Sequence, residues 1–296
     1  MPIGQGSRNS GRAFKRSSGF ARTALQGRLA RAVLATVLAA VSLAGLGGLP
    51  GLAAGSCALE PGGSARVVSI VDGDTVLLES GREVRLVGLQ APKLALGRPN
   101  FDDWPLAAEV RAYLSALLLD ETVSLSYGGA REDRYGRLLA HLHLSDGKWV
   151  QADMLAAGLA RVYSFADNRA CVPDLLAYET AARERRLGIW ALDYYAPRDA
   201  GRPRDLLRLV DTFQLVEGRV HDIATVRGRT FINFGEDWRT DFTIVIQPGD
   251  RRFFPEFLDR YTHVRVRGWI KSFNGPEIVA THPEQIELLP DDPSSF

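Results

Sequence analysis

The alternation of apolar and polar positions predicts a first segment in which strands and helices are mixed. Residues 65–89 hold three strand-like runs, RVVSIV, VLLES and EVRLVGL, and the Asp-Gly and Ser-Gly pairs between them favour a meander. Apolar residues then recur at helical spacing over residues 105–119. Two more strand-like runs, TVSLSY and RLLAHLHL, precede short helices at 149–157 and 174–186. The order predicts a mostly β domain with helices, of the α+β class.

The pattern changes after residue 193. Residues 194–207 contain two prolines, a glycine and several charges, which predict an inter-domain linker. Residues 208–296 carry three strand-like runs, a short helical segment at 254–260 and two further strand-like runs. This order predicts a second small β-barrel domain, closed and OB-like. The first domain then occupies residues 57–193.

The N-terminal residues 1–56 form a basic lead followed by an apolar segment. The stretch 32–55 carries no charge and follows Arg28 and Arg31, a pattern typical of a signal peptide. The stretch is long enough to span a bilayer, although several glycines and one proline weaken a helix in its second half. Cleavage predicts a periplasmic or secreted protein. An uncleaved or lipidated segment predicts a membrane-anchored one instead.

The chain contains two cysteines, Cys57 and Cys171. In an exported protein such a pair most economically forms one disulfide. It would close a loop of more than a hundred residues and contribute roughly 4 kcal/mol in the chain-entropy description. The alternative is two unrelated thiols, one of which leaves with the signal peptide.

Charge is unevenly distributed along the chain. There are 36 Lys and Arg residues against 35 Asp and Glu residues, a formal net charge of +1. Residues 1–59 hold seven of the basic residues and no acidic one, which leaves a net charge of −6 from residue 60 onward. This acidic body excludes nucleic-acid binding that depends mainly on bulk charge. Any affinity for phosphate must therefore come from a local cluster of cations.

Three short motifs in the first domain are specific in their order and spacing. They are Asp72-Gly73-Asp74-Thr75, then Arg85 followed by Gln90-Ala91-Pro92-Lys93, then Asp133-Arg134-Tyr135-Gly136-Arg137. On these motifs, residues 65–193 resemble the staphylococcal nuclease family, also called thermonuclease-like or TNase-like. The resemblance implies an OB-type five-stranded barrel with three helices. It also implies calcium-dependent hydrolysis of phosphodiester bonds in DNA or RNA.

The resemblance assigns roles to individual residues. Asp74 falls at the position of a calcium-binding aspartate, and Arg85 and Arg137 fall at the two arginines that hold the phosphate and stabilise developing charge. A carboxylate suits a hard cation, and a guanidinium group makes two-point contacts with phosphate oxygens. Tyr135 either flanks the phosphate or is a packing residue.

The motif after the third strand departs from the family's Asp-x-Pro-Glu pattern. Gln90 replaces the second metal carboxylate, and Lys93 replaces the glutamate assigned as general base or water-orienting residue. The loss of these acids weakens the case for calcium as a cofactor. A protonated lysine cannot accept a proton from water, but it can bind phosphate. The cluster of Asp74, Arg85, Lys93 and Arg137 is therefore predicted to be a net cationic pocket.

The sequence does not place another carboxylate in this pocket. The candidates for such a stand-in are Asp102, Asp103, Glu109 and Asp133.

The second domain resembles, more weakly, the OB-like C-terminal extension of some bacterial thermonuclease-like proteins. Its aromatic and basic residues interleave, which fits either a packed core or a surface that stacks single-stranded bases. The aromatic residues are Phe231, Phe234, Trp238, Phe242, Trp269 and Phe273, and the basic ones are Arg229, Arg239, Arg267 and Lys271.

Three functions remain open on the sequence. The motifs favour an exported nuclease with an altered site. Gln90 and Lys93 favour a catalytically degenerate domain that binds nucleic acid or another phosphate-containing ligand. The acidic body favours a structural envelope protein. Whether the chain is an enzyme stays open, and the sequence identifies no protein partner.

Overall fold

The computed structural model describes residues 57–254 and 262–290, all of which lie within one compact unit, Pro50–Phe296. The predicted signal peptide lies outside the described residues, and so does nearly all of the predicted helix at 254–260. The described residues before this range end in a 3-10 turn, η3 (Arg251–Phe253), followed by Phe254. Within the described ranges, no helix is both long and apolar enough to cross a bilayer.

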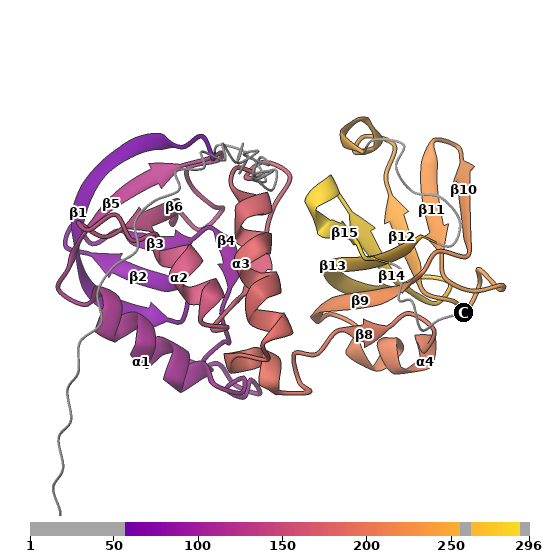
Figure 1. Ribbon diagram of the computed structural model, residues 1–296, viewed down its shortest axis with the longest axis horizontal. Helices are drawn as coiled ribbons and strands as arrows, with labels where there is room; N and C mark the ends of the chain where they lie inside the picture. Colours follow the sequence, from indigo (N-terminus) through magenta and orange to yellow (C-terminus); the bar gives the residue numbers. More distant parts are fainter. Residues whose placement is uncertain (1–56, 255–261, 291–296) are drawn as a thin grey trace, which may run out of the picture. The chain divides into compact units, whose positions relative to one another are not determined.

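Five strands of the first domain close into a barrel in the order β1-β2-β3-β6-β5 (Figure 1). β3 and β6 pair in parallel, and the other neighbours pair antiparallel. Burial alternates along β5, where Val123, Leu125 and Tyr127 face inward, as expected for a strand with one buried face. The strands are β1 (Glu60–Asp72), β2 (Thr75–Leu78), β3 (Glu83–Leu86), β5 (Thr122–Tyr127) and β6 (Leu138–His143).

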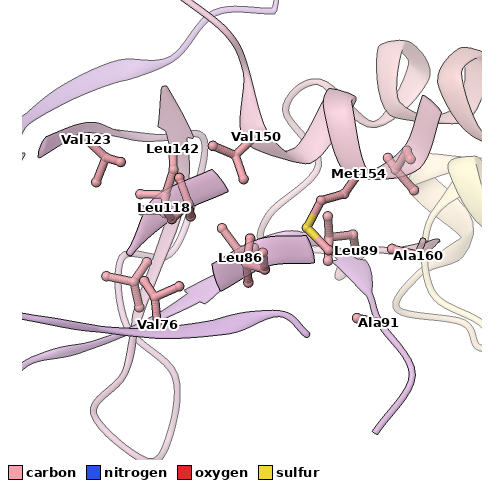
Figure 2. Close-up of a cluster of buried hydrophobic side chains, with 14 of the residues drawn as sticks. Val76, Leu86, Leu89, Ala91, Leu118, Val123, Leu142, Val150, Met154 and Ala160 are labelled. Atoms are coloured by element: carbon pink, nitrogen blue, oxygen red, sulfur yellow. The ribbon is translucent and has the colours of Figure 1, made fainter. Parts of the chain in front are cut away.

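Three helices pack on this barrel. They are α1 (Ala107–Leu118), α2 (Val150–Ala156) and α3 (Val172–Glu184). α1 buries residues at three- and four-residue spacing, so that one face of the helix covers the barrel core. Figure 2 shows Leu118 from this face in the same cluster as Leu86 and Leu142. Two short strands, β4 (Gly88–Gln90) and β7 (Arg161–Tyr163), pair with each other outside the barrel.

The second domain is an eight-stranded sheet that curls into a half-barrel, with the order β10-β11-β12-β14-β13-β9-β8 and β15 paired to β13 (Figure 1). The α+β class and the five-stranded barrel are confirmed, but this second sheet is a half-barrel where the sequence predicted a closed barrel. Its strands are β8 (Arg198–Asp199), β9 (Phe213–Arg219), β10 (Asp222–Val226), β11 (Arg229–Asn233), β12 (Thr243–Ile246), β13 (His263–Ser272), β14 (Pro276–Ala280) and β15 (Ile286–Leu288). The short helical elements are η1 (Gly188–Ala191), α4 (Pro203–Leu206), η2 (Leu207–Leu209) and η4 (Pro283–Gln285).

The segment 194–207 contains β8 and α4 and packs against both domains. β8 pairs in parallel with β9, and the hydroxyl of buried Tyr195 donates a hydrogen bond to the Pro105 carbonyl at 2.7 Å. Tyr195 also shares an apolar cluster with Trp190 and Phe213. The segment therefore holds structure of its own beyond its role as a connection.

A buried ion pair joins the two domains. Arg267 on β13 and Glu179 on α3 are 1% and 0% exposed, and their side chains meet at 2.9 and 3.0 Å. Arg267 also donates to the Val162 carbonyl of β7 at 3.1 Å. Burial would raise the pKa of Glu179, but the Arg267 charge lowers it below its usual range. β13 is thereby fixed next to α3 and β7.

The predicted disulfide is present between Cys57 and Cys171. It joins residues 114 positions apart, with a Cα–Cα distance of 4.6 Å. One end lies just before β1 and the other just before α3, so the bridge ties the start of the barrel to its last helix.

Candidate functional site

A cavity of about 930 Å³ opens along β2, β3 and β6 and gathers most of the predicted site residues. Arg85, Gln90, Lys93, Tyr135 and Arg137 all line it, and this cavity is called the pocket below. Asp74 does not line the pocket, but this fully buried residue contacts two residues that do, Arg85 and Lys93.

Asp74 is surrounded by hydrogen-bond donors. It immediately precedes β2, and the pairing of Thr75 with Arg85 brings β3 alongside, so that Arg85 Nη1 reaches Asp74 Oδ2 at 2.5 Å. Lys93 Nζ lies 2.6 Å from both Asp74 oxygens, and the Ala91 N–H donates to Oδ2 at 2.9 Å. Burial alone would raise the pKa of Asp74, but the charges of Arg85 and Lys93 hold it well below its usual range.

Lys93 also contacts a second carboxylate, Asp72. Its Nζ donates to Asp72 Oδ2 at 3.2 Å, and Asp72 Oδ1 accepts the Asp74 N–H at 3.0 Å in the tight Asp-Gly-Asp turn. Burial and then the neighbouring Asp74 charge raise the pKa of Asp72, although Lys93 acts in the opposite direction. A single ammonium group therefore serves two adjacent carboxylates.

Gln90 is engaged by a buried arginine. β4 pairs with β7 in a register that places Gln90 opposite Arg161, whose Nε and Nη2 donate to Gln90 Oε1 at 3.0 and 2.8 Å. The Arg161 guanidinium lies 4.7 Å from the ring centroid of Phe213 and 5.7 Å from that of Trp104. Burial lowers the pKa of Arg161 to about 10. The carbonyl oxygen of Gln90 is thus already satisfied within the protein.

Asp133 organises the loop that carries Arg137. Its Oδ2 accepts from Arg137 Nε at 2.8 Å, and its Oδ1 accepts from the backbone N–H groups of Tyr135 and Arg137. Partial burial would raise the pKa of Asp133, but the bonds from Arg137 and Tyr135 lower it. Tyr135 is 69% exposed, and its hydroxyl accepts a hydrogen bond from Arg134.

The charges of this cluster balance. The structure adds Asp72 and Asp133 to the acidic side, so that three cations (Arg85, Lys93, Arg137) meet three carboxylates. The predicted excess of positive charge in the pocket is therefore offset. Both acids belong to motifs that the sequence analysis singled out, yet spacing alone does not show which cation each of them contacts.

The other acids considered as stand-ins do not line the pocket. Asp102, Asp103 and Glu109 are absent from its lining, and Asp103 instead accepts a hydrogen bond from the Ala95 N–H at 2.6 Å. Asp133 does line it, as the partner of Arg137.

These residues do not fit a calcium ion. Calcium requires several free oxygen ligands. Both oxygens of Asp74 already contact the Lys93 ammonium, and the Gln90 carbonyl accepts from Arg161. Among the residues that the structure describes, no three His, Cys, Asp or Glu side chains are grouped so as to hold a metal.

Comparison with known proteins identifies the family of the first domain. A sequence profile described as staphylococcal nuclease homologue matches residues 83–192. An "Uncharacterized endonuclease" of Escherichia coli is 30% identical over 129 residues, which are 43% of this chain and 76% of that protein. This chain belongs to the staphylococcal nuclease family. This chain is also similar to a "Thermonuclease" of Staphylococcus hyicus. The two are 28% identical over 130 residues, which cover 43% of this chain and 75% of that protein.

A third relative is similar over a smaller share of its own length. "Endonuclease YncB" of Bacillus subtilis is 32% identical over 130 residues, which are 42% of this chain and 60% of that protein. The profile match ends at residue 192, so the nuclease homologue carries its second domain outside the matched region.

Proposed function

We propose that this nuclease homologue is an exported protein that binds the phosphodiester groups of nucleic acid in the pocket without calcium. The observation that carries the proposal is that Lys93 Nζ lies 2.6 Å from both oxygens of Asp74. The Lys93 ammonium group thus engages both oxygens of the carboxylate that, by resemblance, would bind the metal. Ammonium and guanidinium groups are both suited to phosphate oxygens.

The phosphate would enter by exchange. Arg137 is the most exposed of the three cations, with 30% of its side chain accessible, and its present partner Asp133 is a single residue of the same loop. Lys93 and Arg85 are 20% and 12% accessible and keep the buried Asp74 as their counter-ion. We therefore expect Arg137 to make the main contact with phosphate.

Hydrolysis of the bound phosphodiester is the second candidate function. The convergence of Arg85, Lys93 and Arg137 on one cavity supports it, because these cations could stabilise negative charge that develops on the phosphate. Asp72 adds a carboxylate to the lining of the same cavity. Hydrolysis by these groups would use an altered active site and would not depend on calcium.

Export is supported by the disulfide as well as by the N-terminal pattern. Cys57 and Cys171 pair, and disulfides persist in oxidising compartments. We expect cell fractionation to recover the protein in the periplasm or the medium. Recovery of the reduced protein in the cytoplasm would contradict this part of the proposal.

A binding and cleavage assay tests both candidates. The purified protein is titrated against single- and double-stranded DNA and RNA, once with calcium and once with chelator. We expect binding in chelator that weakens at least tenfold in Arg137→Ala, while Arg66→Ala keeps wild-type affinity, since Arg66 pairs with Asp120 away from the pocket. Equal affinity of the two variants would reject the pocket as the binding site.

Product analysis of the same samples separates binding from hydrolysis. Cleavage in chelator that is lost in Arg137→Ala supports the second candidate. Cleavage that does not exceed that of Arg137→Ala would leave binding alone. Cleavage that requires calcium would contradict the metal-independent proposal.

A further inference from the structure

Six aromatic side chains line the pocket together with the cations, and three of them form one cluster in which Tyr163 contacts both Phe165 and Trp269. Tyr163 ends β7, Phe165 follows two residues later, and Trp269 lies on β13 of the second domain. Phe165 is 45% exposed and Trp269 is 41% exposed. These three residues are called the aromatic wall. The pocket is therefore built from both domains, and the family match covers only one of them.

The aromatic wall is held in place by contacts on several sides. The indole N–H of Trp269 donates to the Tyr163 hydroxyl at 3.1 Å, and the Tyr163 ring meets Phe165 edge-on with centroids 4.8 Å apart. Behind them, the buried Phe213 contacts Tyr163 at 4.9 Å and Trp269 at 6.3 Å between centroids. The rings are thus fixed before any ligand arrives, which reduces the entropy lost on binding.

The position of Trp269 depends on the buried ion pair between the domains. Arg267 precedes Trp269 by two residues on β13 and binds both Glu179 and the Val162 carbonyl. Val162 is the neighbour of Tyr163 in β7. The ion pair therefore places Trp269 next to Tyr163 at the edge of the pocket, where its side chain remains exposed.

We propose that the second domain completes the nucleic-acid site, and that Trp269, with Tyr163 and Phe165, stacks an unpaired base whose phosphate is bound by Arg137 and Lys93. This inference rests on the proposed function. A cavity of about 930 Å³ is large enough for a nucleotide unit. Aromatic faces beside cations are the usual means of holding single-stranded nucleic acid. A base in a duplex has both faces covered by its neighbours, so the aromatic wall selects single strands.

Trp238 offers a matched control within the same domain. It is 49% exposed and stacked by Arg239, with the guanidinium 4.3 Å from the ring centroid, but it does not line the pocket. It therefore has similar chemistry and exposure to Trp269 and differs in location.

The test measures the affinity of the full chain for three fluorescent probes in chelator at one salt concentration. The probes are oligothymidylate, an abasic phosphodiester oligomer of the same length, and a duplex. We expect Trp269→Ala to weaken oligothymidylate binding about 5- to 100-fold and to leave abasic binding unchanged, as loss of one stacked base predicts. Trp269→Phe should restore most of the affinity, and Trp238→Ala should match the wild type.

The outcomes separate this inference from the proposed function. If the wild type binds oligothymidylate but Trp269→Ala binds it equally well, or loses abasic binding to the same degree, base stacking by the second domain is refuted and the phosphate pocket stands. If the wild type binds none of the probes, both are refuted. If Trp269→Ala does not fold, Trp269→Leu makes the same comparison, because it keeps apolar bulk without an aromatic face.

Discussion

Removing the charge of Lys93 tests whether the two carboxylates beside it depend on that cation. Lys93→Met keeps most of the aliphatic chain but leaves Asp74, which is fully buried, and Asp72, whose side chain is 12% exposed, with Arg85 as the remaining cation. Removing one partner of a buried ion pair costs about 3–5 kcal/mol. Lys93 is 20% exposed and Arg85 remains 2.5 Å from Asp74, so we expect a loss near the lower end, about 3 kcal/mol.

The assay is urea unfolding at pH 7, with Lys271→Met as the control. Lys271 contacts Asp211 at 2.5 Å, but their side chains are 53% and 73% exposed, so this pair should contribute less than about 1 kcal/mol. The two pairs have similar contact distances and differ in burial. Equal losses in the two variants would refute the reasoning.

The pH dependence provides a second check on the same variant. Burial and the Asp74 charge raise the pKa of Asp72, and removal of Lys93 raises it further, so the folded variant takes up a proton more readily than the unfolded chain. The difference in free energy of unfolding between the wild type and the less stable variant should therefore become smaller as the pH falls. A difference between the two that grows on acidification would contradict the assignment.

Three further predictions follow from other contacts. The double variant Gln90→Asp with Lys93→Glu should show a rise in melting temperature on addition of calcium. The single variant Gln90→Asp should show none, because Lys93 still neutralises Asp74, and equal responses of the two variants would contradict this. Cys57→Ser with Cys171→Ser should lower the free energy of unfolding by about 4–5 kcal/mol, since the bridge spans 114 residues, and an unchanged urea midpoint would be inconsistent with it. Burial lowers the pKa of His282 from 6.5 to about 4, so the unfolded chain binds the proton first, and His282 should lower the stability by about 2 kcal/mol between pH 7 and pH 5. Burial lowers the pKa of His141 to about 4 as well, so His282→Gln should remove only the share of His282 and make the slope shallower, and an unaltered slope would show that His282 does not contribute to it.

The sequence predicts well what short-range pattern determines. Alternating strands, helical spacing and Asp-Gly turns predicted the order of strands and helices, the family resemblance implied the five-stranded barrel, and the three motifs that the barrel brings together share one cavity. Export as a whole remains a prediction, since the signal segment lies outside the described residues. The linker and domain limits likewise remain predictions.

The partners across the chain were not predictable in the same way. Arg161 meets Gln90 across 71 residues, and Arg267 meets Glu179 across 88 residues, because strand register and domain packing bring them together. Neither spacing nor composition encodes such contacts. The same holds for Trp269, because its interleaving with basic residues favoured a packed core, whereas the structure places its exposed side chain at the pocket.

The pairing of Arg85, Lys93 and Arg137 with the protein's own carboxylates has a consequence for how affinity varies with salt. Nucleic acid normally gains free energy on binding by releasing condensed salt ions, and affinity falls steeply with salt for each phosphate that a free cation neutralises. Here a phosphate must displace Asp133 from Arg137, so the protein carries its own counterions. We expect the slope of affinity against salt concentration to be shallow, with selectivity arising instead from the shape of the site.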